Sequence, residues 1–231
     1  NAGTPQTICF GQSATLTASG GGTYQWNTGA TSATITVNPT STSSFTVTVT
    51  NTAGCTATAA TTVTVNALPV PDAGAPQTIC NGQSATLTAG GGGTYLWSNG
   101  STNATITVSP TATTNYIVTV TNVNGCTASA TTTVTVNPLP VPSAGAPQAI
   151  CDGQSATLTA SGGGTYQWNT GATSATITVN PTATTNYTIT VTNAFGCTAS
   201  AATTVTVNAL PVPNAGTPQT ICFGQSATLT A

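Results

Sequence analysis

The sequence of 231 residues contains no Lys, Arg or His, and its only acidic residues are Asp72 and Asp152. A hydrophobic content of 38% with a net charge of −2 is not the composition of an ordinary disordered chain. The lack of Lys and Arg excludes an electrostatic surface for nucleic acid and a basic helix that lies on a membrane. No apolar run approaches the roughly 18 residues that a membrane-spanning helix needs.

The chain is built from tandem repeats. The string Gly-Gln-Ser-Ala-Thr-Leu-Thr-Ala begins at four positions, each 71 residues after the one before: Gly11, Gly82, Gly153 and Gly224. A period of this length corresponds to one small domain per repeat. We therefore expect these repeats: repeat 1 at 1–71, repeat 2 at 72–142, repeat 3 at 143–213, and the start of a repeat 4 at 214–231.

Two long identities concern the ends of the chain. Residues 214–231 are identical to residues 1–18, and residues 153–182 are identical to residues 11–40. The chain thus begins in a linker and stops within a repeat. We expect it to be cut from a longer array, with repeat 4 truncated.

Strict alternation of apolar residues with Thr or Ser predicts half-buried β-strands. In repeat 1 the alternating segments are Ser13–Ala18, Thr23–Asn27, Ser32–Val37, Phe45–Thr50 and Cys55–Val65. The opposite faces of these segments are almost all Thr, which favours strands and remains polar. No segment has a 3.6-residue period, so we expect essentially no helix.

The order of strands and turns predicts the fold class. Gly- and Asn-rich turns separate the strands, which favours antiparallel neighbours. Sheets with one apolar face bury it against each other, and two such sheets form a sandwich. Trp26 on the second predicted strand is typical of an immunoglobulin-like domain, where we expect it in the core. The predicted fold is all-β: tandem immunoglobulin-like antiparallel β-sandwich repeats, with one disulfide each.

The seven cysteines occur at fixed positions in the repeats, which contain no His and no Cys-x-x-Cys cluster. This pattern favours disulfides over zinc sites and predicts an oxidising, extracellular compartment. Cysteines 46 residues apart would meet at one end of a domain whose five strands alternate in direction. The expected disulfides are Cys9–Cys55, Cys80–Cys126 and Cys151–Cys197. Each would stabilise its repeat by about 4 kcal/mol in a chain-entropy treatment.

Other cysteine pairings are less favourable. A bond between Cys55 and Cys80 would have to reach along a whole domain, whereas the two Cα atoms of a disulfide lie within about 7 Å. Cys222 is left unpaired because its partner would lie beyond residue 231.

Proline-rich linkers join the repeats. They are Asn66–Pro71, Asn137–Pro142 and Asn208–Pro213. Alternating prolines favour an extended and semi-rigid backbone, and five alternating strands place the entry and exit of a domain at opposite ends. We expect a string of domains, with Leu68, Leu139 and Leu210 packed at the joints.

The repeats share a motif that is complete in repeat 2 and combines a Cys-x-Gly-x-Ser-x-Thr-Leu-Thr-Ala start, Tyr-x-Trp, Tyr-x-Val-Thr-Val-Thr-Asn and Gly-Cys. In repeat 2 it comprises Cys80, Leu87, Tyr95, Trp97, Tyr116 and Cys126. This pattern resembles the tandem Ig-like and PKD-like repeats of very large surface adhesins from gliding bacteria that use type IX secretion. The resemblance implies a spacer whose adhesive or anchoring domains lie elsewhere. Repeat 1 has Phe45 where the other repeats have Tyr116 and Tyr187, so a hydroxyl bond there is not common to all.

No set of residues predicts an enzyme. Asp72 and Asp152 occupy different positions of their repeats, and no acid–base partner exists for either of them. A calcium site at a joint would need several carboxylates. We therefore expect no catalytic residue, no cofactor and no metal site.

Carbohydrate and ice remain as alternative ligands. Tyr24 and Trp26 could stack on sugars, but their place on the apolar face favours packing in the core. Asn99, Asn103 and Asn186 match the N-glycosylation sequence, although no glycan is expected in a bacterial protein. The Thr faces could carry O-linked sugars or bind ice, but twisted sheets fit a flat lattice poorly.

Two functional hypotheses remain. Sheet edges usually carry Lys or other charges that prevent pairing with another chain, and this sequence has no such protection. The first hypothesis is a segment of an extracellular filament or surface adhesin that associates with copies of itself as an extended rod. The second is a passive stalk that presents an adhesive domain. Both imply a location at the cell surface or in a secreted fibre.

Overall fold

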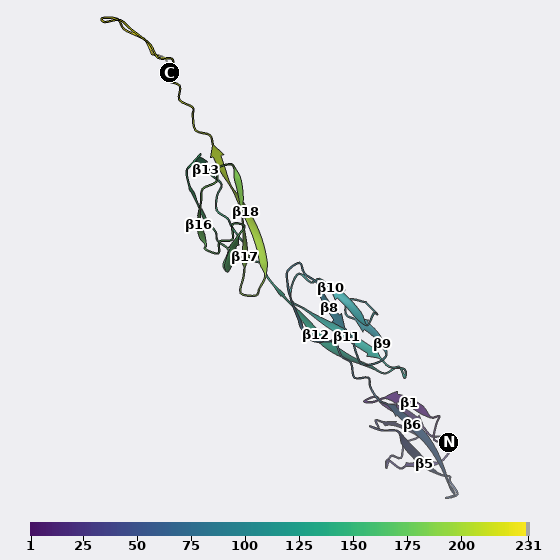
Figure 1. The fold of residues 1–231 in the computed structure, drawn as a ribbon. Helices are drawn as coiled ribbons and strands as arrows, with labels where there is room; N and C mark the ends of the chain where they lie inside the picture. The colour runs from purple at the N-terminus through teal and green to yellow at the C-terminus, as the bar shows by residue number, and fades with distance from the viewer. Residues whose placement is uncertain (230–231) are drawn as a thin grey trace. The chain divides into compact units, whose positions relative to one another are not determined.

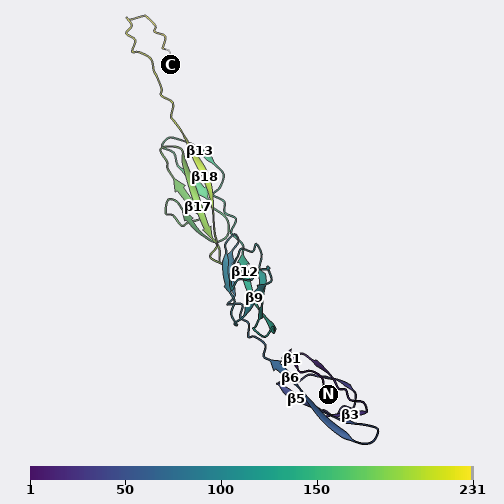
Figure 2. The same cartoon turned by 90° about the vertical axis from the view of Figure 1, so that its right-hand side faces the viewer.

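The computed structural model describes residues 1–229, and throughout them the chain forms β-strands and turns without a helix (Figures 1 and 2). Three sets of six strands repeat with the same lengths. The first set is β1 (Gln6–Cys9), β2 (Ala14–Thr17), β3 (Thr23–Trp26), β4 (Thr34–Val37), β5 (Ser43–Thr50) and β6 (Thr56–Asn66). The second set is β7 (Gln77–Cys80), β8 (Ala85–Thr88), β9 (Thr94–Trp97), β10 (Thr105–Val108), β11 (Thr114–Thr121) and β12 (Thr127–Asn137). The third set is β13 (Gln148–Cys151), β14 (Ala156–Thr159), β15 (Thr165–Trp168), β16 (Thr176–Val179), β17 (Thr185–Thr192) and β18 (Thr198–Asn208).

Each set of strands forms two sheets. In repeat 1 the larger sheet has the order β1-β6-β5-β3, and the smaller sheet pairs β2 with β4. All of these pairs are antiparallel except β1 with β6, which are parallel. Repeats 2 and 3 have the same order of strands. The predicted fold class is confirmed: tandem immunoglobulin-like β-sandwiches, with the core between the two sheets.

A tryptophan forms the centre of each core, as predicted. Trp26 is 2% exposed and belongs to one buried cluster with Leu16 of β2 and Val47 of β5. Antibody domains place a disulfide between these two strands beside the Trp. Leu16 and Val47 are each 0% exposed, so apolar packing occupies the place of that disulfide here.

The long last strand buries a polar residue. On one face of β6, Ala57 is exposed, whereas Thr61 is buried. Thr61 pairs across the sheet with Phe45. Its hydroxyl has no hydrogen-bond partner among the described residues, and the same holds for Thr132 and Thr203 in the other repeats.

Strand β1 was not predicted. Its four residues lie beside the carboxyl-terminal end of β6, with Gln6 opposite Val63 and Cys9 opposite Asn66. Ile8 of this strand is 9% exposed and joins the core of repeat 1. Because β1 runs parallel to β6, it places Cys9 at the exit end of the repeat.

The chain divides into two compact units, Asn1–Val136 and Asn137–Ala231. The first unit holds the sandwiches of repeats 1 and 2, and the second holds the sandwich of repeat 3 with the linker that precedes it. The part of the chain that the structure describes contains no helix long and apolar enough to span a membrane.

Candidate functional site at the joint between repeats

A disulfide connects the first two repeats. Cys9 at the end of β1 bonds to Cys126, the residue before β12, with 5.6 Å between the two Cα atoms. The expected bond between Cys9 and Cys55 does not form. Cys55 precedes β6, whereas Cys9 lies beside the last residue of that strand, and the 11 residues of β6 between these points span about 35 Å. The prediction was wrong because it placed Cys9 at the entry end of the repeat.

The remaining cysteines also depart from the prediction. Because Cys126 bonds to Cys9, the expected pair of Cys80 and Cys126 does not form. Cys80 and Cys197 are both disulfide-bonded, and they lie one period of 71 residues after Cys9 and Cys126. The expected pair of Cys151 and Cys197 is also absent, because Cys151 is a free thiol. The free cysteines of the described chain are Cys55, Cys151 and Cys222, and all three are exposed.

The linker after repeat 1 is bound to repeat 2 by an asparagine. The side-chain amide Nδ2 of Asn122 donates a hydrogen bond of 2.9 Å to the carbonyl oxygen of Ala67. The Oδ1 atom of the same side chain accepts from the backbone N–H of Cys126 at 3.0 Å, which fixes the turn that leads into β12. Asn193 in repeat 3 repeats this arrangement, with its Nδ2 atom 2.8 Å from the carbonyl oxygen of Pro138.

A glycine loop allows the linker to lie close to repeat 2. Asp72 and Gly90 form an antiparallel β-bridge, with backbone hydrogen bonds of 3.1 and 2.9 Å. A Cβ atom at Gly91 would lie against the carbonyl oxygen of Val70 and 2.9 Å from the Cα atom of Pro71. This contact excludes any side chain at Gly91, so the linker occupies a groove that only glycine leaves open.

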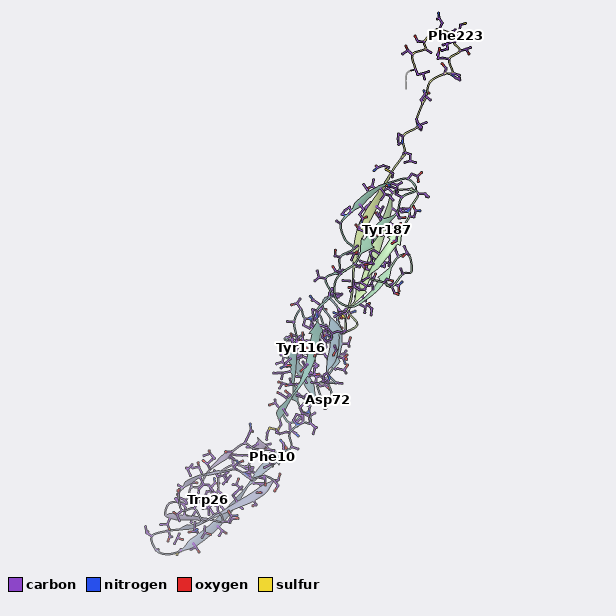
Figure 3. All side chains as sticks on the ribbon, turned by 90° about the vertical axis from the view of Figure 1, so that its left-hand side faces the viewer. Phe10, Trp26, Asp72, Tyr116, Tyr187 and Phe223 are labelled. Atoms are coloured by element: carbon purple, nitrogen blue, oxygen red, sulfur yellow. A yellow bond between two sulfur atoms is a disulfide. The ribbon has the colours of Figure 1, made fainter. Side chains whose placement is uncertain are left out.

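Apolar side chains surround the disulfide on the side of repeat 1. One cavity of about 260 Å³ is lined by Cys9, Phe10 and Leu68 together with Gly125 and Thr127 of repeat 2. Leu68 is 39% exposed and therefore packs only in part, whereas Val70 is 83% exposed. Phe10 is labelled in Figure 3 and is 51% exposed. The joint thus combines a covalent bond, backbone hydrogen bonds and a small apolar contact.

The two aspartates, Asp72 and Asp152, form hydrogen bonds with backbone groups of the chain. Asp72 accepts a hydrogen bond of 2.8 Å from the backbone N–H of Gly74, which orders the first residues of repeat 2. Asp152 is exposed, and its backbone N–H donates to the carbonyl oxygen of Asn208 at 2.9 Å. The described residues include no cluster of three or more His, Cys, Asp or Glu that could hold a metal ion.

The sheet surfaces are uncharged and rich in hydroxyl groups. Cross-strand pairs bring hydroxyl oxygens together, such as Thr119 and Ser129 at 2.9 Å. The three asparagines of the glycosylation sequences, Asn99, Asn103 and Asn186, are all exposed. Tyr24 and its counterparts are half-buried against the core, and the indole of each Trp is buried. These Tyr and Trp side chains therefore present no exposed pair of rings on which a sugar could stack.

Comparisons with known proteins give structural neighbours only. No family model matches the sequence, and no curated protein matches it. The first eight immunoglobulin domains of Down Syndrome Cell Adhesion Molecule match at 18% identity and a TM-score of 0.32, with 90% of this chain and 40% of that chain covered. A tandem segment from titin matches at 12% identity and a TM-score of 0.38, covering 91% and 98%. A 1.5-MDa bacterial ice-binding adhesin matches at 17% identity and a TM-score of 0.31, covering 87% and 94%. The likeness concerns the tandem immunoglobulin fold alone.

Proposed function

We propose that this chain is a structural repeat segment of an extracellular filament or surface adhesin, with domains at 1–71, 72–142 and 143–213 and the start of a fourth at 214–231. The disulfide between Cys9 and Cys126 carries this proposal, because it bonds a repeat to its neighbour instead of closing a loop within one repeat. Such a bond has no use in an isolated domain. It maintains the connection between domains when the chain is under tension.

The energetics of the joint fit this role. The bond closes a loop of 117 residues, for which the chain-entropy treatment gives a stabilisation of about 5 kcal/mol. Domains of about 70 residues have little apolar surface to bury, so a covalent connection adds a large share of their stability. Disulfides form and persist in oxidising compartments, which supports a location outside the cell or on its surface.

Association of copies is supported by the surface. Strands β1 and β3 are the two edge strands of the larger sheet. The sequence has no Lys or Arg, so neither edge carries the positive charges that usually prevent pairing with another chain. Contacts between such surfaces would be polar and apolar but not ionic. The extended-rod arrangement and the bacterial surface origin suggested by the sequence motif are part of the same proposal.

Sedimentation of the full chain at low and high salt tests the association. We expect assemblies that persist at high salt, because screening weakens only interactions between charges. Electron microscopy of both samples would show whether the assemblies are fibres. Assemblies that dissolve in moderate salt would contradict the proposed contact chemistry.

The passive stalk is the alternative function. The joint supports it equally, since a covalently connected spacer also resists extension. It requires no contact between copies, so a monodisperse monomer at high protein concentration would favour the stalk over the filament.

A further inference from the structure

The sequence contains three Asn-Gly pairs, all of them in exposed turns of repeat 2. They are Asn81-Gly82, Asn99-Gly100 and Asn124-Gly125. In such a pair the backbone nitrogen of the glycine can attack the side-chain amide of the asparagine, because glycine has no Cβ atom that shields its nitrogen. Whether the attack occurs in the folded chain depends on how each turn holds the glycine N–H.

The turn at Asn99 binds both of the groups that would react. The N–H of Gly100 donates a hydrogen bond of 2.8 Å to the carbonyl oxygen of Trp97. Gly100 is the fourth residue of this turn, so its N–H closes the turn. The Oδ1 atom of Asn99 accepts a hydrogen bond of 3.1 Å from the backbone N–H of Ser101. Rotation of the Asn-Gly peptide toward the side chain would break these bonds.

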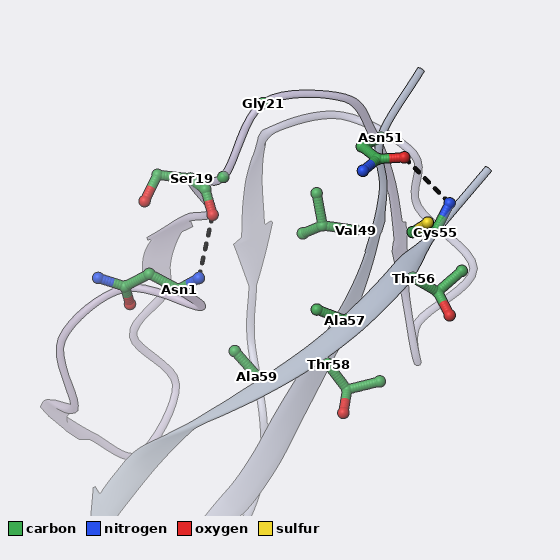
Figure 4. A pocket seen from close by; sticks show the side chains of 11 residues that line it. Asn1, Ser19, Gly21, Val49, Asn51, Cys55, Thr56, Ala57, Thr58 and Ala59 are labelled. Atoms are coloured by element: carbon green, nitrogen blue, oxygen red, sulfur yellow. Dashed lines mark hydrogen bonds between the residues drawn. The ribbon is translucent and has the colours of Figure 1, made fainter. Parts of the chain in front are cut away.

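The turn before β12 holds its glycine in the same way. The N–H of Gly125 donates a hydrogen bond of 3.0 Å to the carbonyl oxygen of Asn122. The side-chain Oδ1 of Asn122 also accepts a hydrogen bond of 3.0 Å from the backbone N–H of Asn124. Figure 4 shows the equivalent turn of repeat 1, which the side chain of Asn51 fixes by accepting a hydrogen bond from the backbone N–H of Cys55. Attack by the glycine nitrogen therefore requires this turn to open.

The turn at Asn81 leaves the glycine N–H free. Its closing hydrogen bond runs from the backbone N–H of Gln83 to the carbonyl oxygen of Cys80, at 2.9 Å. Gly82 is the third residue of the turn and has a φ of +88°, as glycine has in a type II turn. Among the described residues, neither the N–H of Gly82 nor the side chain of Asn81 has a hydrogen-bond partner. The peptide between these two residues can therefore rotate without breaking a hydrogen bond.

Repeat 3 has an aspartate at the position that is equivalent to Asn81. Asp152 lies one period of 71 residues later and is followed by Gly153, whose φ of +83° matches that of the glycine in repeat 2. The backbone N–H of Gln154 closes this turn with a hydrogen bond of 3.0 Å to the carbonyl oxygen of Cys151. The same turn thus accommodates a carboxylate, which is the group that loss of the amide at Asn81 would produce.

We propose that Asn81 is a site of spontaneous deamidation, which converts it to aspartate and isoaspartate while Asn99 and Asn124 keep their amides for longer. The nitrogen of Gly82 loses its proton and bonds to Cγ of Asn81, and the amide nitrogen Nδ2 leaves as ammonia, which takes up the proton. Water then opens the cyclic imide. Cleavage between the Gly82 nitrogen and Cγ gives aspartate, whereas cleavage between that nitrogen and the main-chain carbonyl carbon gives isoaspartate. The inference does not depend on the proposed function.

The reaction changes the chain beside a disulfide. It adds one negative charge to a sequence whose net charge is −2 and which has no Lys, Arg or His to pair with it. Isoaspartate also adds a methylene group to the backbone directly after Cys80, which is disulfide-bonded. In repeat 1 the equivalent residue is Phe10, which lines the cavity at the joint. Deamidation of Asn81 thus places a charge where repeat 1 has an apolar side chain.

Mass spectrometry of the folded chain during incubation in mildly alkaline buffer tests the inference. Pepsin cleaves the samples at acidic pH, and the mass increase from amide to acid reports conversion at each of the three asparagines. We expect Asn81 to convert at least about five-fold faster than Asn99 or Asn124, which is the factor for opening one hydrogen bond. Both aspartate and isoaspartate should form. Equal rates at the three sites, or faster conversion at Asn99 or Asn124, would overturn the proposal.

The unfolded chain and one variant provide the controls. After reduction and denaturation the turns are lost, so the three Asn-Gly pairs should convert at similar rates. A preference for Asn81 that persists in the unfolded chain would contradict the proposal, because the turn could not be its cause. Asn81→Gln keeps an amide but lengthens the side chain by a methylene group, which disfavours ring closure and should abolish conversion at this position. An unchanged rate in this variant would show direct hydrolysis by water and would also refute the attack by Gly82.

Discussion

At the residue scale, each repeat depends on one buried tryptophan. The indole nitrogen of Trp97 donates a hydrogen bond of 3.0 Å to the carbonyl oxygen of Asn103, and the ring fills the centre of the core at 1% exposure. Trp26 and Trp168 bond in the same way to Ser32 and Ser174. The bond also fixes the loop that follows β9, so the side chain has both a packing and an anchoring role.

Replacing this residue should affect one repeat. Trp97→Ala is expected to destabilise repeat 2 by about 3–5 kcal/mol and leave repeat 3 nearly unchanged, because each repeat has a core of its own. Hydrogen exchange measured by mass spectrometry would show loss of protection in β9, β11 and β12 but not in β15, β17 and β18. Trp97→Phe keeps an aromatic ring and should cost less. Loss of protection in all three repeats in a single transition would refute their independence.

Replacing the buried threonine of the last strand should stabilise a repeat, in contrast to replacing the tryptophan. Thr132 is 2% exposed, and within residues 1–229 its hydroxyl has no hydrogen-bond partner, so the core contains an unsatisfied polar group. Thr132→Val has the same shape without the hydroxyl and should stabilise repeat 2 by about 1 kcal/mol. Thr132→Ser keeps the hydroxyl, loses a methyl group and should destabilise it. Thermal unfolding of both variants measures the difference, and a destabilised valine variant would mean that the hydroxyl is satisfied.

At the element scale, the sequence predicted those strands whose apolar residues alternate over a long enough segment. Strands β2 to β6 match the predicted segments, because Leu16, Ile35 and Val47 mark their buried faces clearly. Strand β1 has only four residues, and Ile8 is the one that is buried. Such a short segment shows no alternation of apolar and polar residues from which a strand could be predicted. Strand β1 pairs in parallel with β6, which lies far along the chain, and the residues of β1 alone do not predict this pairing.

The missed strand explains why the candidate site was predicted with the wrong contacts. Spacing and strand direction placed Cys9 and Cys55 at one end of a domain, but β1 carries Cys9 to the other end, beside Asn66. Of the cysteines predicted to form disulfides, Cys55 and Cys151 are free thiols, and Cys9 bonds to Cys126 of the next repeat. Which cysteines meet depends on the neighbouring repeat, and a pattern within one repeat contains no information about that.

The glycine loop of repeat 2 provides a test of the joint at this scale. Gly91→Ala should displace the linker, since the new Cβ atom would collide with Val70 and Pro71. Gly92→Ala is the matched control: its φ is +67° with nothing within 4 Å, so it should cost only the roughly 1–2 kcal/mol of left-handed backbone strain. Hydrogen exchange in residues 66–72 should increase for the first variant alone. Similar exchange in both variants would show that the linker is not held by this contact.

At the scale of the whole molecule, the disulfide at the joint makes repeats 1 and 2 one covalent assembly. The disulfide from Cys9 to Cys126 spans a sequence separation of 117 residues and gives tension a path that bypasses the intervening chain. Cys80 and Cys197 are also disulfide-bonded, at positions one period later. A repeat in such an array can lose its fold without its full length being drawn out, which is a useful property in a surface fibre or stalk.

Stretching single molecules by their two ends, with and without a reductant, tests this most directly. An intact bond between Cys9 and Cys126 withholds the chain between them from extension. Reduction should therefore lengthen the fully unfolded molecule by at least about 400 Å, at roughly 3.5 Å per residue over the separation of 117 residues. The same final length in oxidising and reducing buffer would contradict the covalent joint, and with it the proposal that this chain is a segment built to transmit load.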